Sequence, residues 1–145
     1  MLITLCGRID LNMVIVTGKI KGKARPRFNT KTGRAFTPGD TIKYENWIKC
    51  CYQEQDGKFI EGAVRARIEV CYKIPKSYTK KRVQAIRDGL EKPLKKPDSD
   101  NIAKIVLDSL NKIAFDDDAQ VVELIVVKRW TEEQERIEFE LEEIR

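Results

Sequence analysis

The sequence predicts a single-domain α/β (α+β) protein, in which a mixed β-sheet carries its helices mainly on one face. Three observations lead to this prediction. The chain has 145 residues, which is the length of one ordinary domain. Strand and helix patterns follow one another in the order strand, loop, helix, strand, two helices, two strands. No internal repeat, linker or low-complexity tract divides the chain, so we expect residues 1–145 to form one domain.

The first predicted strand is residues 13–20, MVIVTGKI, which are rich in β-branched side chains. Residues 1–12 precede it, and two interpretations are open: a non-essential N-terminal appendage, or translation from an upstream start codon. They lack the basic start and the long apolar run of a signal peptide, and no segment is apolar enough to span a membrane. The four cysteines form no C-x-x-C pair. We therefore expect a cytoplasmic protein with reduced cysteines.

A basic segment follows the first strand. Its Lys and Arg residues have no acid among them, and we expect them to bind DNA phosphates. They are Lys19, Lys21, Lys23, Arg25, Arg27, Lys31 and Arg34. Residues 30–33 predict the turn of a short hairpin, and Gly22 and Pro26 favour a loop that projects from the sheet. We expect Phe28 and Phe36 to tuck beneath this loop rather than to stack on DNA bases.

Two helices and a strand are predicted in the middle of the chain. Residues 40–53 begin with capping residues and predict a helix. Apolar and polar side chains alternate over residues 64–74, which predicts a strand with one buried face. Residues 77–89 predict a second helix with a basic surface. Lys95 and Lys96 continue this positive surface, and we expect both to bind DNA.

The segment 95–121 contains six of the chain's aspartates around one predicted helix. Apolar residues at helical spacing within 102–113 predict a buried stripe. The opposite face presents one polar ridge with steps of four residues. This ridge consists of Asp100, Lys104, Asp108 and Lys112. The helix is followed by the three aspartates at 116–118.

Two further strands complete the chain. Residues 121–127 are apolar at nearly every position, which is typical of a central strand covered on both faces. Residues 137–142 alternate apolar and acidic side chains and predict a final strand. We expect it to lie antiparallel to residues 121–127 across a turn.

Carboxylates at both ends of a helix, with a lysine between them, are typical of a Mg²⁺ site that acts on phosphodiesters. Mg²⁺ takes oxygen ligands, usually one or two carboxylates together with water and phosphate. Lys104 is placed to balance the charge that develops on the phosphate. The chain has no histidine, which excludes histidine triads, His–Zn sites and histidine general bases. We expect Mg²⁺, with Mn²⁺ as a substitute, and no small-molecule cofactor.

Each group of acids also has a purely structural explanation. Asp98 or Asp100 is a suitable N-cap of the helix, and residues 116–118 suit a turn. The polar ridge suits solvated ion pairs. If all three explanations hold, the chain is a non-catalytic nucleic-acid-binding protein whose aspartates serve only as helix-cap and turn residues.

The pattern D-x-D-N-x-x-K-x-x-x-D-x-L, followed by D-D-x-Q-V, resembles the RusA family of Holliday junction resolvases, which are crossover junction endodeoxyribonucleases of bacteria, prophages and phages. Here the pattern consists of Asp98, Asp100, Asn101, Lys104, Asp108 and Leu110, then Asp117, Asp118, Gln120 and Val121. The resemblance implies a Mg²⁺-dependent nuclease whose catalytic acids and metal ligands are Asp98, Asp100 and Asp118, assisted by Lys104. Asp117 and Asp108 are alternative ligands, since the third consecutive acid, Asp116, leaves open which member of that run binds metal.

The resemblance also implies a branched DNA substrate, a four-way junction resolved by paired nicks in recombination and repair. The charge distribution agrees, because residues 1–96 hold 22 Lys and Arg against 9 acids and residues 97–145 hold 6 against 14. Two nicks on symmetry-related strands require two identical sites, so we expect a homodimer. A helix over 101–113 rises about 18 Å, which leaves two arrangements open: Asp118 joins the other acids within one subunit, or the site is shared across the dimer. The arrangement within one subunit is favoured, because Asn111 is able to end the helix and lengthen the return of the chain.

Overall fold

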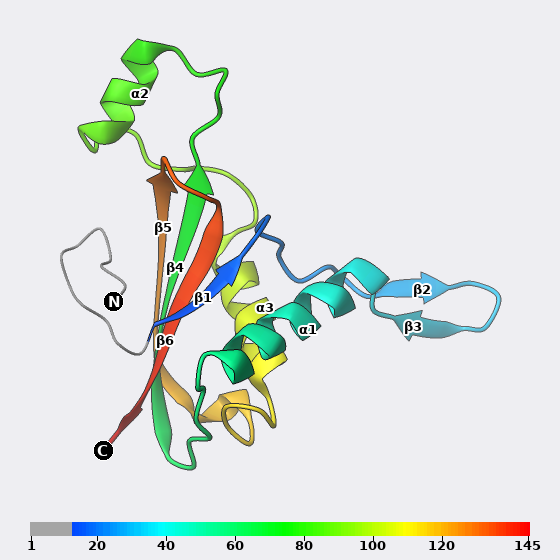
Figure 1. Ribbon diagram of the computed structural model, residues 1–145. Coiled ribbons are helices and arrows are strands. Elements are labelled where there is room, and N and C mark those ends of the chain that lie inside the picture. Colours follow the sequence, from blue (N-terminus) through cyan, green and yellow to red (C-terminus); the bar gives the residue numbers. More distant parts are fainter. Residues whose placement is uncertain (1–12) are drawn as a thin grey trace.

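A computed structural model describes residues 13–145, so the prediction about residues 1–12 lies outside the described part of the chain. Three α-helices, a four-stranded mixed sheet and a separate two-stranded hairpin form one α/β domain (Figure 1). This arrangement confirms the predicted fold class and the predicted order of elements. A short 3-10 helix, η1 (Asp118–Gln120), precedes the last two strands.

The sheet has the strand order β1-β6-β4-β5. Its strands are β1 (Val14–Thr17), β4 (Ala63–Lys73), β5 (Val121–Thr131) and β6 (Arg136–Ile144). β6 runs antiparallel to both β1 and β4, and β5 runs parallel to β4. The alternation predicted for β4 is confirmed, because Val64, Ile68 and Val70 are fully buried on the face that meets the helices.

Two predictions about the last strands are wrong. β5 is the edge of the sheet and not a central strand, and Val122, Leu124 and Ile125 are 62, 46 and 44% exposed. β5 and β6 do not pair either, because β4 lies between them (Figure 1). Residues 132–135 are long enough to cross β4, since neighbouring strands lie about 4.8 Å apart and an extended residue spans about 3.3 Å.

Two helices cover one face of the sheet, namely α1 (Gly39–Glu54) and α3 (Ser99–Leu110) (Figure 1). The predicted apolar stripe of α3 is confirmed, because Ile102, Ile105, Val106 and Leu110 are all 0% exposed. α3 ends at Asn111, its C-cap, earlier than predicted.

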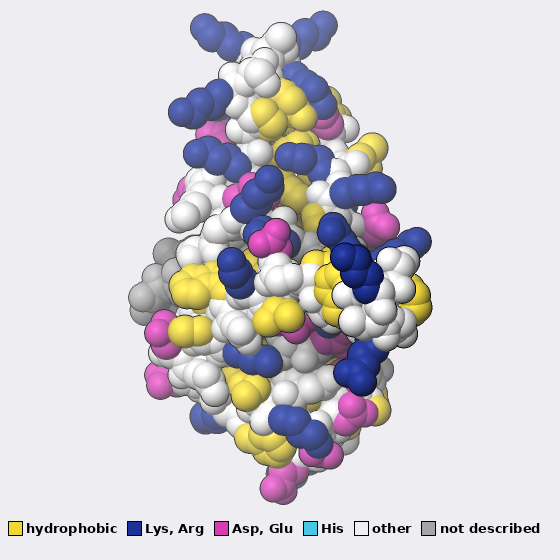
Figure 2. Space-filling view, turned by 90° about the vertical axis from the view of Figure 1, so that its right-hand side faces the viewer, with side chains coloured by type: hydrophobic (Ala, Val, Ile, Leu, Met, Phe, Trp, Pro, Cys, Tyr) yellow, Lys and Arg dark blue, Asp and Glu magenta, His cyan; other side chains and the backbone are white. Residues whose placement is uncertain are grey.

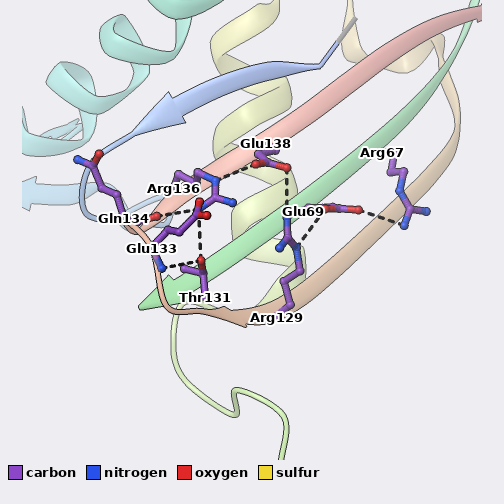
Figure 3. Close-up of polar contacts among 8 residues, drawn as sticks. All are labelled: Arg67, Glu69, Arg129, Thr131, Glu133, Gln134, Arg136 and Glu138. Carbon is purple, nitrogen blue, oxygen red and sulfur yellow. Dashed lines mark hydrogen bonds and ion pairs between the residues drawn. The ribbon is translucent and has the colours of Figure 1, made fainter. Parts of the chain in front are cut away.

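An ionic network lies on the other face of the sheet (Figure 3). Arg129 of β5 contacts Glu69 of β4 at 3.1 Å and Glu138 of β6 at 3.2 Å. Arg136 contacts the same Glu138 at 2.7 Å. Both glutamates are only 5% exposed, so their charges are balanced by arginines and not by water.

The hairpin consists of β2 (Arg27–Asn29) and β3 (Arg34–Phe36) and projects away from the sheet, as predicted (Figure 1). Its turn is residues 30–33, which is also as predicted. The prediction that the phenylalanines tuck beneath the loop is wrong, because Phe28 is 64% and Phe36 48% exposed. All six strand residues are exposed, so this ribbon has no second layer that would cover the rings.

The remaining helix, α2 (Lys80–Arg87), lies beyond the end of the sheet (Figure 1). Thr79 is its N-cap, and the Thr79 hydroxyl accepts a hydrogen bond from the backbone N–H of Arg82 at 3.2 Å. The three cysteines of the described residues, Cys50, Cys51 and Cys71, form no disulfide with one another, and Cys51 and Cys71 are buried. Within residues 13–145, no helix is long and apolar enough to cross a membrane.

Candidate active site

The start of α3 is anchored from two sides. The Tyr72 hydroxyl at the end of β4 donates a hydrogen bond to the carbonyl of Pro97 at 3.2 Å. On the other side, the backbone of Gly22 lies so close that a Cβ there would be 2.7 Å from Nδ2 of Asn101 and 2.8 Å from Cβ of Pro97. The basic segment therefore rests directly on the D-x-D-N motif.

The two acids of that motif lie at the start of α3, Asp98 as the N-cap residue and Asp100 in the first turn, where the helix dipole favours an acid. Asp98 occupies the N-cap position, and its carbonyl accepts the N–H of Ile102 at 3.0 Å, yet its side chain makes no capping hydrogen bond. Asp98 and Asp100 are both exposed, and neither side chain has an ion-pair partner among the described residues. Side-chain capping does not explain these carboxylates, which leaves their oxygens available to a ligand.

Lys104 lies one turn further along α3 and is exposed. The expected ion pairs along the ridge are not formed in the described part of the chain. Asp108 pairs with Lys23 at 3.2 Å and Lys112 pairs with Asp116. Within residues 13–145, Lys104 therefore has no ion-pair partner, and it lies one helical turn from Asp100.

The three consecutive aspartates have three different environments. Asp116 forms the ion pair with Lys112. Asp117 caps η1, because its side chain accepts the backbone N–H of Ala119 at 3.3 Å. Asp118 is half-buried, and its pKa is raised by burial and then by the neighbouring carboxylates of Asp117 and Asp108. The structural explanation thus holds for Asp116 and Asp117 and fails for Asp118.

Gln120 holds the acidic loop in place. Its side-chain oxygen accepts the backbone N–H groups of Asp116 at 2.8 Å and Asp117 at 3.2 Å. Its amide group donates to the carbonyls of Ile60 and Gly62, both at 3.0 Å. This role was not predicted, although the fixed place of the glutamine two residues after Asp118 in the motif was a signal for it.

Lys23 lies inside the site rather than on the DNA-facing surface expected for it. Its ammonium group contacts Glu45 of α1 at 2.5 Å and Asp108 of α3 at 3.2 Å. Burial acts to lower the pKa of Lys23, but the two carboxylates outweigh burial and raise it. No sequence pattern connected Glu45 to this site.

The other predicted DNA-binding residues are all exposed. They are Lys21, Arg25, Arg27, Lys31, Arg34, Lys95 and Lys96. Lys95 and Lys96 directly precede the motif, and the basic segment crosses it at Gly22. The exposed acids of the motif are thus bordered by cations from two segments far apart in the sequence.

The predicted metal ligands lie at two ends of α3. Asp98 and Asp100 are at its start, whereas Asp118 neighbours Asp108, eight residues and about 12 Å of helix rise beyond Asp100. In residues 13–145, no three acids or cysteines lie close enough together to hold one metal ion.

Fold and site define a small α/β protein that presents exposed carboxylates beside a basic segment, which leads into a projecting hairpin. The chain belongs to the RusA family, because the family model Endodeoxyribonuclease RusA matches residues 17–142. A similar protein is the Uncharacterized protein YqaN of Bacillus subtilis (strain 168). It is 32% identical over 141 residues, which cover 94% of this chain and 99% of YqaN.

Proposed function

We propose that this protein is a Mg²⁺-dependent, structure-selective endodeoxyribonuclease that resolves Holliday junctions by paired nicks in DNA recombination and repair. Membership of an endodeoxyribonuclease family supports the reaction class. The observation that carries the proposal is the state of the motif acids. Asp98 and Asp100 are exposed and free of capping bonds at the point where two basic segments meet.

The donor set fits Mg²⁺, because carboxylate oxygens are the protein ligands this ion prefers. Asp98, Asp100 and Asp118 would hold it, with Asp108 beside Asp118. When bound, such an ion supplies Lewis-acid activation of the scissile phosphate and of the water that attacks it. The pKa of Asp118 is raised first by burial and then by the carboxylates of Asp117 and Asp108. A bound cation would offset both effects, because it favours the charged carboxylate.

The other residues position the DNA. Lys104 stabilises the negative charge that develops on the phosphate, because its ammonium group is unpaired and one turn from Asp100. We name residues 19–36, the basic segment with its hairpin, the hairpin segment. Its exposed cations, together with Lys95 and Lys96, bind the phosphates on either side of the cut. Lys23 acts through Asp108, whose carboxylate it holds in place.

The working unit in this proposal is a homodimer that pairs through β5. The edge of β5 carries exposed Val122, Leu124 and Ile125, and an exposed apolar edge strand is a template for pairing with another strand. Two copies of the same edge, paired antiparallel, form a closed twofold interface. Such a pair supplies two identical sites for two symmetry-related strands.

This pairing also brings the separated acids together. The N-terminal end of β5 directly follows Asp118, and its C-terminal end lies by the segment before α3, where Lys128 donates a hydrogen bond to the carbonyl of Lys95. In an antiparallel pair, the C-terminal end of one β5 lies beside the N-terminal end of the other. Asp98 and Asp100 of one subunit therefore approach Asp118 of its partner, and the site is shared.

Incubation of the protein with a labelled four-way junction in Mg²⁺ tests the function. We expect paired nicks, no cutting of a linear duplex, and no cutting in chelator. Asp100→Asn should abolish cleavage while junction binding persists, because a ligand is lost and a charge that repels phosphate is removed. Binding of the junction without cleavage by the wild-type protein in Mg²⁺ or Mn²⁺ would instead indicate the non-catalytic nucleic-acid-binding protein.

Mixing two inactive variants tests the shared site. Equal amounts of Asp98→Asn and Asp118→Asn protein form about half heterodimers, each with one intact shared site, so about a quarter of the wild-type nicking activity should return. The products should be single nicks rather than paired cuts. No recovery, in a mixture shown to exchange subunits, would place the site within one subunit. A protein that stays monomeric by sedimentation and still makes paired cuts would contradict the dimer itself.

A further inference from the structure

A second basic surface surrounds α2. We name residues 73–96 the α2 arm; they contain nine Lys and Arg residues and two acids. The arm extends beyond the end of the sheet (Figure 1). In Figure 2, Lys and Arg side chains crowd the end of the molecule where α2 lies. Such a concentration of one sign of charge creates a strong local field for a polyanion.

Most of these cations are not used by the fold. Glu91 pairs with Arg82 at 2.7 Å and Glu132 pairs with Arg87 at 2.6 Å, so the acids closest to α2 already have arginine partners. Asp88 accepts a hydrogen bond from Gln84 at 3.0 Å. All seven lysines of the arm are exposed and have no ion pair in the described structure, although Lys95 lies over the rings of Tyr72 and Trp130. Six of them therefore have neither an ion pair nor an aromatic contact among the described residues. They are Lys73, Lys76, Lys80, Lys81, Lys92 and Lys96.

The position of these lysines works against the stability of α2. Lys80, Lys81 and Arg82 form its first turn, which contains no acid. Cations at a helix N-terminus are unfavourable, because the aligned peptide dipoles already place positive charge there. Packing accounts for Arg82, which lies 3.6 Å over the ring of Tyr78, but not for Lys80 and Lys81. The arm contacts the body through buried Ile86 of α2 and through Tyr78, just before α2, whose ring meets Trp130 edge to face at 5.9 Å.

The arm and the hairpin segment meet at the acid motif. The arm ends at Lys96, next to Pro97 and Asp98 in the chain, and the hairpin segment touches Pro97 and Asn101 at Gly22. From this meeting point, the two basic structures extend in different directions (Figure 1). DNA cut at the motif would therefore have cations available along two diverging paths.

We propose that the α2 arm binds the phosphates of a second duplex, which diverges at the motif from the duplex held by the hairpin segment. This inference rests on the proposed function and adds the origin of the selectivity for branched DNA. A linear duplex follows one path and engages one of the two basic structures. A four-way junction engages both, so the α2 arm contributes to junction binding and not to linear-duplex binding.

The test compares two triple variants with the same change in net charge. Lys76→Gln, Lys80→Gln and Lys81→Gln neutralise the arm. Lys49→Gln, Lys58→Gln and Arg145→Gln remove three positive charges elsewhere and serve as the control. Affinity for a four-way junction and for a linear duplex of the same arm length is measured across a salt series in chelator, so that no DNA is cut. Thermal melting verifies that both variants fold.

We expect the arm variant to bind the junction at least about tenfold more weakly near 0.1 M salt, with a log–log salt slope lowered by up to about 2.7 for three lost contacts. Its linear-duplex affinity should match that of the control. An unchanged junction slope, or equal losses on junction and linear duplex, would overturn the inference. Cleavage of junctions by the wild-type protein is measured separately. If the wild type cuts junctions, the proposed function stands even when the inference about the arm is overturned. If the wild type cuts nothing, the proposed function is removed whatever the arm variant does.

Discussion

Substitution of Gly22 by alanine tests whether the basic segment is seated on the acid motif. An added methyl carbon would lie 2.7 Å from Nδ2 of Asn101, 2.9 Å from its Cγ and 2.8 Å from Cβ of Pro97. Favourable contacts between carbon atoms lie at about 3.5–4.0 Å, so the segment must move by roughly 0.8 Å. The Asn101 side chain is able to rotate away, but the proline ring is not.

Overpacking of this kind costs about 1–3 kcal/mol. We expect Gly22→Ala to lower the free energy of unfolding in urea by that amount. The shift also carries Lys23 away from Asp108, which is now 3.2 Å from its ammonium group, so the cleavage rate at saturating junction should fall more than junction affinity does.

Gly39 provides the matched control. It is the first residue of α1, and an added Cβ there meets no atom within 4 Å. Gly39→Ala should leave the cleavage rate unchanged and stabilise the protein by about 0.4–1 kcal/mol, through the lower entropy of the unfolded chain. If Gly22→Ala unfolds at the same urea concentration as the wild type and cuts junctions at the same rate, the segment does not rest on α3 as described.

Three more perturbations separate catalytic from structural charges. The folded state raises the pKa of Asp118 above its ordinary value of 3.8. Ionised Asp118 therefore lowers the stability of the folded state at pH values above the raised pKa, and this loss disappears below pH 3.8. Asp118→Asn should therefore raise the melting temperature at pH 7 without metal, and Mg²⁺ should raise the melting temperature of the wild type only; a lower melting temperature of the metal-free variant would contradict this sign. Lys104→Ala should slow single-turnover cleavage about 100-fold with little change in affinity. Lys112→Ala should cut normally, because Lys112 lies beyond the end of α3 and pairs with Asp116; equal rates of the two variants would remove Lys104 from the reaction. Arg129→Met removes one arginine from each of two buried glutamates, which keep Arg67 and Arg136 as partners, and should destabilise the protein by about 1.5–3 kcal/mol in urea. Arg65→Met removes exposed pairs and should change little, so similar effects of the two arginine variants would refute the burial argument.

The elements with local causes were predictable from the sequence. The stripe of α3 follows from helical spacing, and the turn at residues 30–33 follows from turn-forming residues, so both were found without knowledge of the fold. The position of β5 at the edge of the sheet is not determined by its local sequence. An apolar run suits a central strand or an exposed edge equally well, and pairing with β4, more than 50 residues earlier in the chain, decides between them. The same long-range choice separates β5 from β6.

The site residues also divide into those with a local sequence signal and those whose contacts depend on the fold. The motif predicts Asp98 and Asp100 as site residues, because its members are adjacent in the chain, and that assignment stays a prediction. The contacts of Lys23 with Glu45 and Asp108 join three separate segments, and a basic run gives no sign of which cation turns inward. Three consecutive aspartates cannot be ranked from sequence alone either. Their roles depend on Lys112 and on the cap of η1, which exist only once the loop has folded.

The separation of the acids bears on how the site closes. For Asp118 to reach Asp100 within one subunit, the last turns of α3 must unwind and the acidic loop must leave its place. Leu110 and Phe115 are both 0% exposed, and their exposure would cost about 3–6 kcal/mol together. The four hydrogen bonds of Gln120 would be lost as well. The pairing through β5 proposed above would require none of these changes and would cover the exposed Val122 and Leu124, which favours the proposed shared site. A dimer that must form before its acids meet also confines cutting to the assembly that holds two sites, which is what two matched nicks in one junction require.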